Sequence, residues 1–429
     1  MENKTSRIRS VSIKKLWGVK NIETEFHKNV NIFIGVNGTS KTTFLNLIEA
    51  TLSCELEILY DIEFEEIKIN LTSLGHLNNT MISVKKLYDI SSDTYCFKYN
   101  IAGKDYEIIY SNYGYRTLRP GTKFYDEYLT VKSELSSLLN ISWLSINRSN
   151  ISYDEYYDRR EYSSRLINTI DKKIEDLVEK LIGYNLQLEV EVTKSIDLFK
   201  KESLLLMLFD SSCDKLDLFN LKEQEQINGL KIELYKAFNA LEIKNKNAKI
   251  QQHIAKINDV YTKLNKGELA IEDALVLPLI NRTFSMLDLF KEYENKKKFM
   301  LEPLNMFWRS VEEFMNGKTF ALDTNNGKIK IGLNEGNDED KDIDITSLSS
   351  GEKQLFILLA ETLLQKGVTH LFVADEPELS LHIGWQRIIL EKILELNPKA
   401  QLIVATHSPE IASSFPDNII NMKSITSYE

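Results

Sequence analysis

The sequence has 429 residues, a net charge of −10 at pH 7 and three cysteines. This length exceeds one ordinary domain, and the negative charge argues against a globally basic nucleic-acid-binding surface, although a local basic groove stays open. Cys54, Cys96 and Cys213 form no C-x-x-C pair, so we expect neither a disulfide framework nor a zinc site. No apolar run reaches the roughly 20 residues that cross a bilayer, and a cytoplasmic protein without a membrane partner is expected.

The chain begins with a predicted hairpin and a phosphate-binding loop. Residues 11–16 and 22–26 flank Gly18 as two short strands. The apolar strand Val30–Ile34 then leads into residues 35–43 and an apolar-periodic helix. Small residues between a strand and a helix let backbone N–H groups face phosphate oxygens, and the helix N-terminus adds partial positive charge. This pattern predicts a nucleotide phosphate site.

One position of this loop departs from the G-x-x-x-x-G-K-[ST] pattern. Ser40 replaces the second glycine, so its Cβ would narrow the loop or force a strained dihedral angle, which leaves the nucleotide affinity open. Lys41 would reach the β- and γ-phosphates of ATP, and the Thr42 hydroxyl would complete the coordination of a hydrated Mg²⁺. The predicted nucleotide-binding residues of the loop are Gly35, Asn37, Gly38, Thr39, Ser40, Lys41, Thr42 and Thr43.

Alternating apolar and polar residues follow the predicted helix of the loop. Such alternation is typical of half-buried strands, and it predicts an antiparallel β-subdomain beside the nucleotide core. A further apolar strand over residues 141–146 ends at Asn147 and Arg148. The alternating segments are residues 67–71, 81–84, 95–99 and 106–110, with a turn over residues 102–105.

The middle block, residues 158–313, is predicted to be helical. It has no convincing strand pattern, and no proline occurs between Pro120 and Pro278. Apolar residues keep helical 3-4 spacing over residues 167–181 and again over residues 250–264. If these runs pair as an antiparallel arm of about 35 residues per helix, the arm reaches roughly 50 Å. A compact helical lobe is the other interpretation.

The last block opens with a predicted hairpin and an acidic loop. Residues 320–323 and 328–331 flank the turn at residues 325–327. The acidic run 337–342 lacks the spacing of a calcium loop, so we interpret it as solvated rather than metal-binding.

Three further segments complete this block. Residues 348–354 form a Leu-Ser-x-Gly-Glu loop that opens a helix, and an apolar strand follows that ends in Asp375 and Glu376. A last strand, residues 401–405, ends at Thr406 and His407. Strands that alternate with helices imply a mostly parallel sheet with its ligand at the C-terminal strand ends.

The order of these motifs carries a family resemblance. Residues 35–43, 348–354, 372–376, 378–382 and 406–407 together resemble the ATPase heads of the ABC superfamily, in the branch shared by structural-maintenance-of-chromosomes (SMC) proteins and overcoming-lysogenization-defect (OLD) nucleases. The resemblance implies an α/β fold, an ABC-type P-loop ATPase head with a mixed sheet core, an antiparallel β-subdomain and a helical insertion. Residues 1–157 and 314–429 would form the two halves of the head, and residues 158–313 the insertion.

The resemblance also assigns roles to single residues. Asp375 would hold Mg²⁺ through water, and Glu376 would orient and deprotonate the attacking water, since phosphoryl transfer depends mainly on positioning and charge stabilisation. His407 would sense the γ-phosphate. Ser349 and the Gly351 N–H would contact that phosphate from a second copy of the chain, again at a helix N-terminus.

The glutamine loop of the family cannot be transferred to this chain. The first glutamine is Gln187, which lies inside the predicted helical block. Asn147 or Arg148, at the end of a predicted strand, occupies the place where that loop is expected.

The strings S-L-S-S-G-E-K-Q and D-E-P-E-L-S-L-H are similar to those of bacterial anti-phage ATPases, such as the ATPases of the PARIS and Septu systems and of some retrons. An OLD-type nuclease domain is expected to be lacking, since about twenty residues follow His407. The resemblance therefore implies a slow, homo-oligomeric ATPase that acts as sensor or scaffold. Its expected partners are a separately encoded effector, a Toprim or HNH nuclease, and a phage-encoded trigger.

A second hypothesis belongs to another functional class, that of DNA-repair or DNA-clamp ATPases acting directly on nucleic acid. The lysines of residues 244–246 and 296–298 would then contact phosphates, whereas lysine runs are also typical of solvated helix faces. The middle block is shorter than the coiled coil of a double-strand-break repair ATPase and lacks a Cys-x-x-Cys zinc hook.

Overall fold

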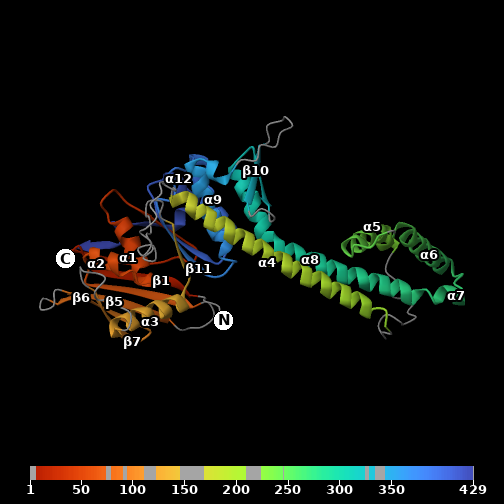
Figure 1. The fold of residues 1–429 in the computed structure, drawn as a ribbon, viewed down its shortest axis with the longest axis horizontal. Helices are drawn as coiled ribbons and strands as arrows, with labels where there is room; N and C mark the ends of the chain where they lie inside the picture. Colours follow the sequence, from red (N-terminus) through yellow and green to blue (C-terminus); the bar gives the residue numbers. More distant parts are fainter. Residues whose placement is uncertain are drawn as a thin grey trace, which may run out of the picture. The chain divides into compact units, whose positions relative to one another are not determined.

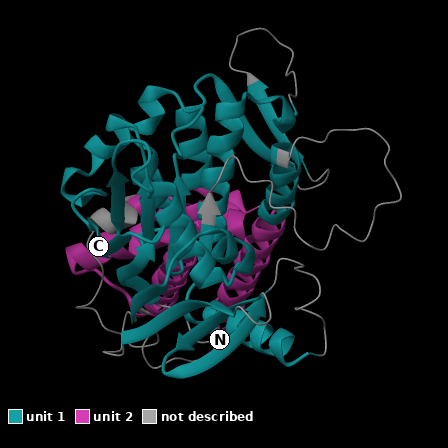
Figure 2. Cartoon of the chain, turned by 90° about the vertical axis from the view of Figure 1, so that its left-hand side faces the viewer, with its two compact units in different colours: residues 1–182, 306–429 teal, residues 183–305 magenta. Residues whose placement is uncertain are grey.

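The computed structural model describes residues 6–73, 79–89, 94–110, 122–144, 169–208, 224–244, 246–323, 328–333 and 344–428. Figure 2 shows its two compact units. Residues 1–182 and 306–429 form the head unit, and residues 183–305 form the helical unit.

The boundaries of the units lie inside two long helices, α4 (Thr169–Leu205) and α8 (Leu277–Phe314) (Figure 1). The sequence placed them instead at 157/158 and 313/314. The difference has a physical cause, since the start of α4 is tied to the helix α9 (Ser350–Leu364) of the head. Two ion pairs of 2.6 Å, Lys353–Asp171 and Lys173–Glu361, make this connection.

One sheet of the head unit has seven strands in the order β14-β2-β1-β4-β5-β6-β7. Its strands pair antiparallel, which confirms the predicted β-subdomain. Ala102 and Gly103, both at positive φ, make the two-residue turn between β6 and β7, so Lys104 and Asp105 belong to a strand rather than to the predicted turn. The strands are β1 (Ser6–Leu16), β2 (Lys20–Glu25), β4 (Glu66–Ser73), β5 (Asn79–Asp89), β6 (Thr94–Ile101), β7 (Lys104–Tyr110) and β14 (Thr426–Tyr428).

The apolar face of this sheet packs against α1 (Lys41–Ser53), α2 (Leu56–Asp61) and α3 (Lys123–Leu138). Sequence analysis did not predict α3, of which only Val131 and Leu135 are fully buried. Lys86 of β5 closes the end of α2. Its ammonium group donates to the carbonyl oxygens of Leu59, Tyr60 and Ile62 at 2.5–2.9 Å and lies 4.7 Å from the centroid of the Tyr95 ring.

The second sheet of the head unit has five strands in the order β13-β3-β12-β11-β8. Every neighbouring pair is parallel, which confirms the predicted parallel sheet. The three inner strands β3, β12 and β11 are almost fully buried and mostly apolar, as expected for a sheet covered on both faces. The strands are β3 (Val30–Ile34), β8 (Ile141–Leu144), β11 (His370–Asp375), β12 (Ala400–Ala405) and β13 (Ile419–Asn421).

The predicted hairpin of the last block is confirmed by β9 (Lys318–Asp323) and β10 (Lys328–Leu333), which pair antiparallel. A 3₁₀ turn at Ile345–Ser347 precedes α9. The short elements that follow α9 are α10 (Ile383–Gln386), α11 (Ile389–Leu396), α12 (Pro409–Ser414) and a 3₁₀ turn at Pro416–Asn418. Several segments singled out from the sequence lie outside the described residues, namely Asn147, Arg148, Cys213 and residues 325–327 and 337–342.

The helical unit contains α5 (Gln224–Ala240), α6 (Asn247–Lys266) and α7 (Ile271–Ala274) besides the inner parts of α4 and α8. Of the two interpretations of the periodic runs, the one in which they pair with each other as an arm is not what the structure shows. The partner of α4 here is α8, since the Phe199 ring lies 5.7 Å from Phe290 and 5.9 Å from Tyr293. The run 250–264 lies on α6, which packs beside α5 in the same apolar core.

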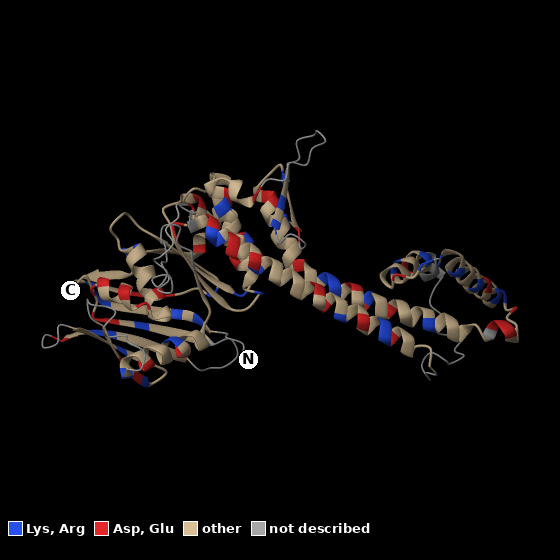
Figure 3. Ribbon diagram, viewed as in Figure 1, with Lys and Arg blue, Asp and Glu red and all other residues tan. Residues whose placement is uncertain are grey.

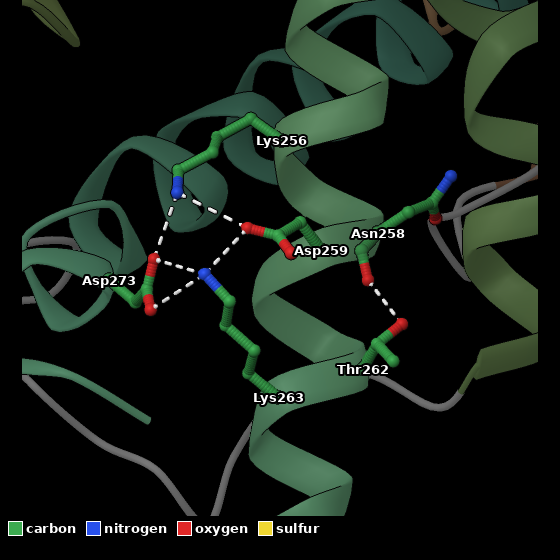
Figure 4. Close-up of polar contacts among 6 residues, drawn as sticks. All are labelled: Lys256, Asn258, Asp259, Thr262, Lys263 and Asp273. Carbon is green, nitrogen blue, oxygen red and sulfur yellow. Dashed lines mark hydrogen bonds and ion pairs between the residues drawn. The ribbon is translucent and has the colours of Figure 1, made fainter. Parts of the chain in front are cut away.

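Four charged side chains join α7 to α6 (Figure 4). Asp273 accepts from Lys256 at 2.8 Å and from Lys263 at 3.2 Å. Asp259 completes the network at 3.4 Å from Lys256 and 2.9 Å from Lys263. Each oxygen of the buried Asp273 carboxylate thus contacts a lysine, which offsets the cost of removing this charge from water.

Acidic and basic residues alternate along α4 and α8 and do not separate into one-sign stripes (Figure 3). Lys297, from one of the two lysine runs, lies 6.0 Å from the centroid of the Tyr293 ring. No helix in the described part of the chain is long and apolar enough to span a membrane.

Candidate nucleotide site

The phosphate loop joins the end of β3 to the start of α1. Gly38 has φ +82°, and Ser40 has φ +68°, which is the left-handed conformation that glycine adopts readily. The strained dihedral angle expected for Ser40 is thus present. Lys20 of β2 donates to the Ser40 hydroxyl at 3.1 Å. The serine that replaces glycine therefore binds a second lysine at the edge of the phosphate loop.

Gly35 is required by the packing of this loop. A Cβ at Gly35 would lie 2.6 Å from the Thr39 hydroxyl oxygen and 3.4 Å from Met422 Cβ. The same hydroxyl donates to the Val36 carbonyl at 2.7 Å and cannot move away without losing that bond. The loop therefore encloses a space that a larger residue at position 35 would fill.

Lys41 brings the separate motifs together. Its side chain is 6% exposed, and its ammonium group lies 2.8 Å from the Gly35 carbonyl oxygen and 2.8 Å from His407 Nε2. His407 Nε2 in turn lies 3.9 Å from Glu376 Oε1. The C-terminal ends of β3, β11 and β12 thus collect a lysine, a carboxylate and an imidazole, as the parallel sheet predicts.

The cluster combines one buried cation with three carboxylates. Burial lowers the pKa of Lys41, and the negative charges of Glu376, Asp375 and Glu378 oppose that shift. The buried cation therefore lies among carboxylates and within reach of the loop that would hold phosphates.

Glu376 itself has an unusual backbone. Its φ is +50°, and its N–H donates to the Ala405 carbonyl at 2.8 Å, which extends the β11–β12 ladder beyond Asp375. Left-handed backbone in a residue with a Cβ costs about 1–2 kcal/mol and is concentrated at functional sites. Ser380, in the turn that follows, also has positive φ, +70°.

ATP with Mg²⁺ fits these residues. Thr42 is exposed in the first turn of α1, and Asp375 ends β11, next to the central strand β12; from these two places oxygen ligands would hold a hydrated Mg²⁺. Asn37, Thr39 and Thr43 surround the same helix start, where N–H groups favour phosphate. ATP would supply the transferable phosphoryl group there, and Glu376 would orient the attacking water.

Ser349 and Gly351 lie at the start of α9. Ser349 caps this helix, since its hydroxyl accepts from the Glu352 N–H at 3.4 Å while the Ser349 N–H donates to the Glu352 carboxylate at 2.9 Å. Gly351 packs against the Ser380 turn, where a Cβ would lie 2.3 Å from the Ser380 oxygen. Within the described ranges, Ser349 and Gly351 make no hydrogen bond or ion pair with the phosphate loop of their own chain.

Sequence reasoning missed two residues of this site. Lys20 follows a turn and gave no motif signal, although its place in the hairpin that precedes the loop fixes it near Ser40. Glu378 belongs to the D-E-P-E-L-S-L-H string, but no role in the nucleotide site was predicted for it. No group of three His, Cys, Asp or Glu side chains suited to a metal occurs in the described part of the chain.

The fold is that of a P-loop ATPase, with a phosphate loop between β3 and α1 and a parallel sheet. The comparison with protein families agrees: the model for the AAA ATPase domain matches residues 7–412. The chain therefore belongs to the AAA ATPase domain family.

Two curated relatives match shorter segments. A segment of 74 residues, 17% of this chain and 27% of the relative, is 43% identical to an "Uncharacterized ABC transporter ATP-binding protein" of Haemophilus influenzae. A segment of 130 residues, 28% of this chain and 23% of the relative, is 27% identical to a "Retron Vc95 probable ATPase" of Vibrio cholerae. The chain thus spans about a quarter of the length of these relatives.

Solved structures of SMC heads align over nearly the whole chain. The SMC head domain with an extended coiled coil from Pyrococcus furiosus, bound to the C-terminal domain of ScpA, gives a TM-score of 0.45 at 13% identity and covers 99% of this chain and 96% of its own. The SMC head with a coiled coil and joint from Pyrococcus yayanosii gives 0.44 at 14% identity, with 97% and 95% covered.

Proposed function

We propose that the chain is an ATP-hydrolysing sensor or scaffold subunit of an anti-phage defence system. ATP-driven assembly of two heads would control a separately encoded effector, a Toprim or HNH nuclease, in response to a phage-encoded trigger. One observation carries the assembly step. Lys41, Glu376 and His407 are gathered in one protomer, whereas Ser349 and Gly351 make no hydrogen bond or ion pair with the phosphate loop of that protomer among the described residues.

The split arrangement favours a second copy as the source of the missing contacts. Ser349 and its neighbour Ser350 are exposed at the N-terminus of α9, where a helix of 15 residues presents N–H groups and partial positive charge. A partner's γ-phosphate is a ligand that this helix end would bind.

Slow turnover is part of the proposal. Lys41 must exchange its bonds to the Gly35 carbonyl and to His407 for phosphate oxygens before the site is complete. The defence assignment is supported by the similarity of the D-E-P-E-L-S-L-H string to anti-phage ATPases and by the match to a protein named as a retron ATPase.

The test separates ATP binding from hydrolysis. Lys41→Ala should lose most ATP affinity, because no other described side chain replaces the buried ammonium group at the loop. Glu376→Gln should keep ATP affinity, lose turnover by at least about 100-fold and remain an ATP-bound multimer in light scattering after size exclusion. Glu395→Gln, a carboxylate of α11 paired with Lys392, is the matched control and should behave as wild type. Wild-type turnover by Glu376→Gln, or no ATP-dependent assembly, would reject the proposal.

The effector is tested by co-expression with candidate Toprim or HNH nucleases from the genes that neighbour the gene of this chain. With ATP, Glu376→Gln should retain a tagged nuclease, and Lys41→Ala should release it. Strong, salt-dependent DNA binding by the isolated chain, without nuclease capture, would favour the DNA-clamp hypothesis instead.

A further inference from the structure

The turn that follows Glu376 contains an acidic residue that neither the nucleotide nor Mg²⁺ requires. We infer that this residue, Glu378, is a positioning residue for His407. The inference rests on the proposed ATPase function and adds to it the group that fixes the γ-phosphate sensor. Glu378 would act through the backbone of His407 and would not touch the substrate.

Glu378 Oε1 accepts hydrogen bonds from three donors at the end of β12. These are the Thr406 hydroxyl, the His407 N–H at 3.0 Å and the Ser408 N–H at 3.2 Å. The Ser408 N–H also donates to the Thr406 hydroxyl oxygen at 2.8 Å, which closes a small ring of bonds. One carboxylate oxygen thus holds two consecutive backbone N–H groups of the strand end.

This contact controls where the imidazole points. Two N–H bonds to a single oxygen fix the peptide planes on both sides of the His407 Cα, and bonds to a charged acceptor are roughly twice as strong as neutral ones. The ring then lies with Nε2 2.8 Å from Lys41 Nζ and 3.9 Å from Glu376 Oε1. A displacement of about 1 Å in such a site can lower a rate about 100-fold.

Stability alone does not explain a carboxylate at position 378. Oε2 of Glu378 is buried and has no hydrogen-bond partner among the described residues. A buried carboxylate oxygen that is left unpaired costs free energy. A glutamine would supply the same acceptor oxygen without a buried charge, so the charge itself must serve the site.

The segment that carries Glu378 is fixed from both sides. Gln354 of α9 donates to the Pro377 carbonyl at 2.9 Å, and the Gln386 side chain donates to the Leu381 carbonyl at 2.9 Å. Glu378 is therefore presented to the strand end by a rigid turn, and its removal should disturb the local geometry of His407 without unfolding the turn.

The inference is tested by a double-mutant cycle on steady-state ATP hydrolysis. Glu378→Ala should lower kcat about 10- to 100-fold and leave KM for ATP within about threefold. Glu378→Gln keeps one acceptor oxygen and should recover part of that loss. In a His407→Ala background, Glu378→Ala should change kcat less than twofold, because the residue it positions is already absent. Glu395→Ala is the control and should not change kcat.

A second readout does not depend on hydrolysis. Hydrogen exchange of the His407 and Ser408 amides, followed by NMR, should be at least about tenfold faster in Glu378→Ala than in wild type, with a smaller change in Glu378→Gln. Unchanged amide exchange, or losses in kcat that multiply in the double variant, would overturn the inference. Wild-type protein without ATP turnover would instead reject the proposed function, and the exchange rates would still decide the role of Glu378.

Discussion

Replacing Gly351 by alanine tests the packing of the α9 start against its own chain. The new Cβ would lie 2.3 Å from the Ser380 carbonyl oxygen, whereas carbon–oxygen contacts ordinarily keep about 3.3 Å or more. The two segments must therefore open by about 1 Å. The Ser380 carbonyl cannot swing aside cheaply, because the residue has φ +70° in a turn closed by the Leu381 N–H to Glu378 carbonyl bond of 2.9 Å.

Overpacking of this kind costs typically about 1–3 kcal/mol. The thermal midpoint of the nucleotide-free protein should accordingly fall in Gly351→Ala. The matched control is Gly183→Ala in α4, where a new Cβ meets nothing within 4 Å. There alanine should raise stability by about 0.5–1 kcal/mol through helix propensity.

The expected changes in stability have opposite signs in Gly351→Ala and Gly183→Ala, so comparing the two variants is decisive. Because the clash lies inside one protomer, the loss in Gly351→Ala should be present without ATP, whereas a role toward a partner's phosphate would show only with ATP. A midpoint of Gly351→Ala equal to or above that of wild type, measured without nucleotide, would refute the packing argument.

Two further predictions concern buried charges. Burial lowers the pKa of Lys86 from 10.5 to about 8, so between these pH values the folded state binds fewer protons than the unfolded chain. The free energy of unfolding of wild type, compared with that of Lys86→Met, should thus rise with pH across this interval by at most about 1.4 kcal/mol per pH unit. Denaturant titrations of both proteins measure this difference, and the same pH dependence in both would contradict the prediction. The hydrogen bonds from Lys256 and Lys263 lower the pKa of Asp273 below 3.8, so its stabilisation is present above pH 3.8 and lost as pH falls through the folded-state pKa. Thermal midpoints of wild type and Asp273→Asn should converge at low pH and separate near neutrality; equal midpoints at pH 6 would show that the network in Figure 4 contributes nothing.

The parallel sheet and the phosphate loop could be predicted because their signals are local. A buried apolar strand followed by small residues, a lysine and a helix has few alternative structures. The same holds for the alternating strands of the β-subdomain, where the period of two specifies the buried face. Helix α3 could not be found in this way, since only Val131 and Leu135 are fully buried, while Tyr128 and Leu138 pack on the core only in part.

The pairing of the helices and the role of Glu378 depend on contacts between distant parts of the sequence. The runs 167–181 and 250–264 carry equal helical periodicity, and periodicity does not specify a partner. The aromatic contacts of Phe199 show that α4 packs against α8. The bonds of Glu378 join residues 28–30 positions apart, which no spacing rule in the sequence indicates.

The continuity of α4 across residues 182 and 183 has a mechanical consequence. A covalent rod leads from the Asp171 and Lys173 ion pairs with α9 to the helical unit, and no linker interrupts it. Excising the helical unit would sever this rod and α8 mid-helix and leave up to four bare carbonyl or amide groups at each cut end.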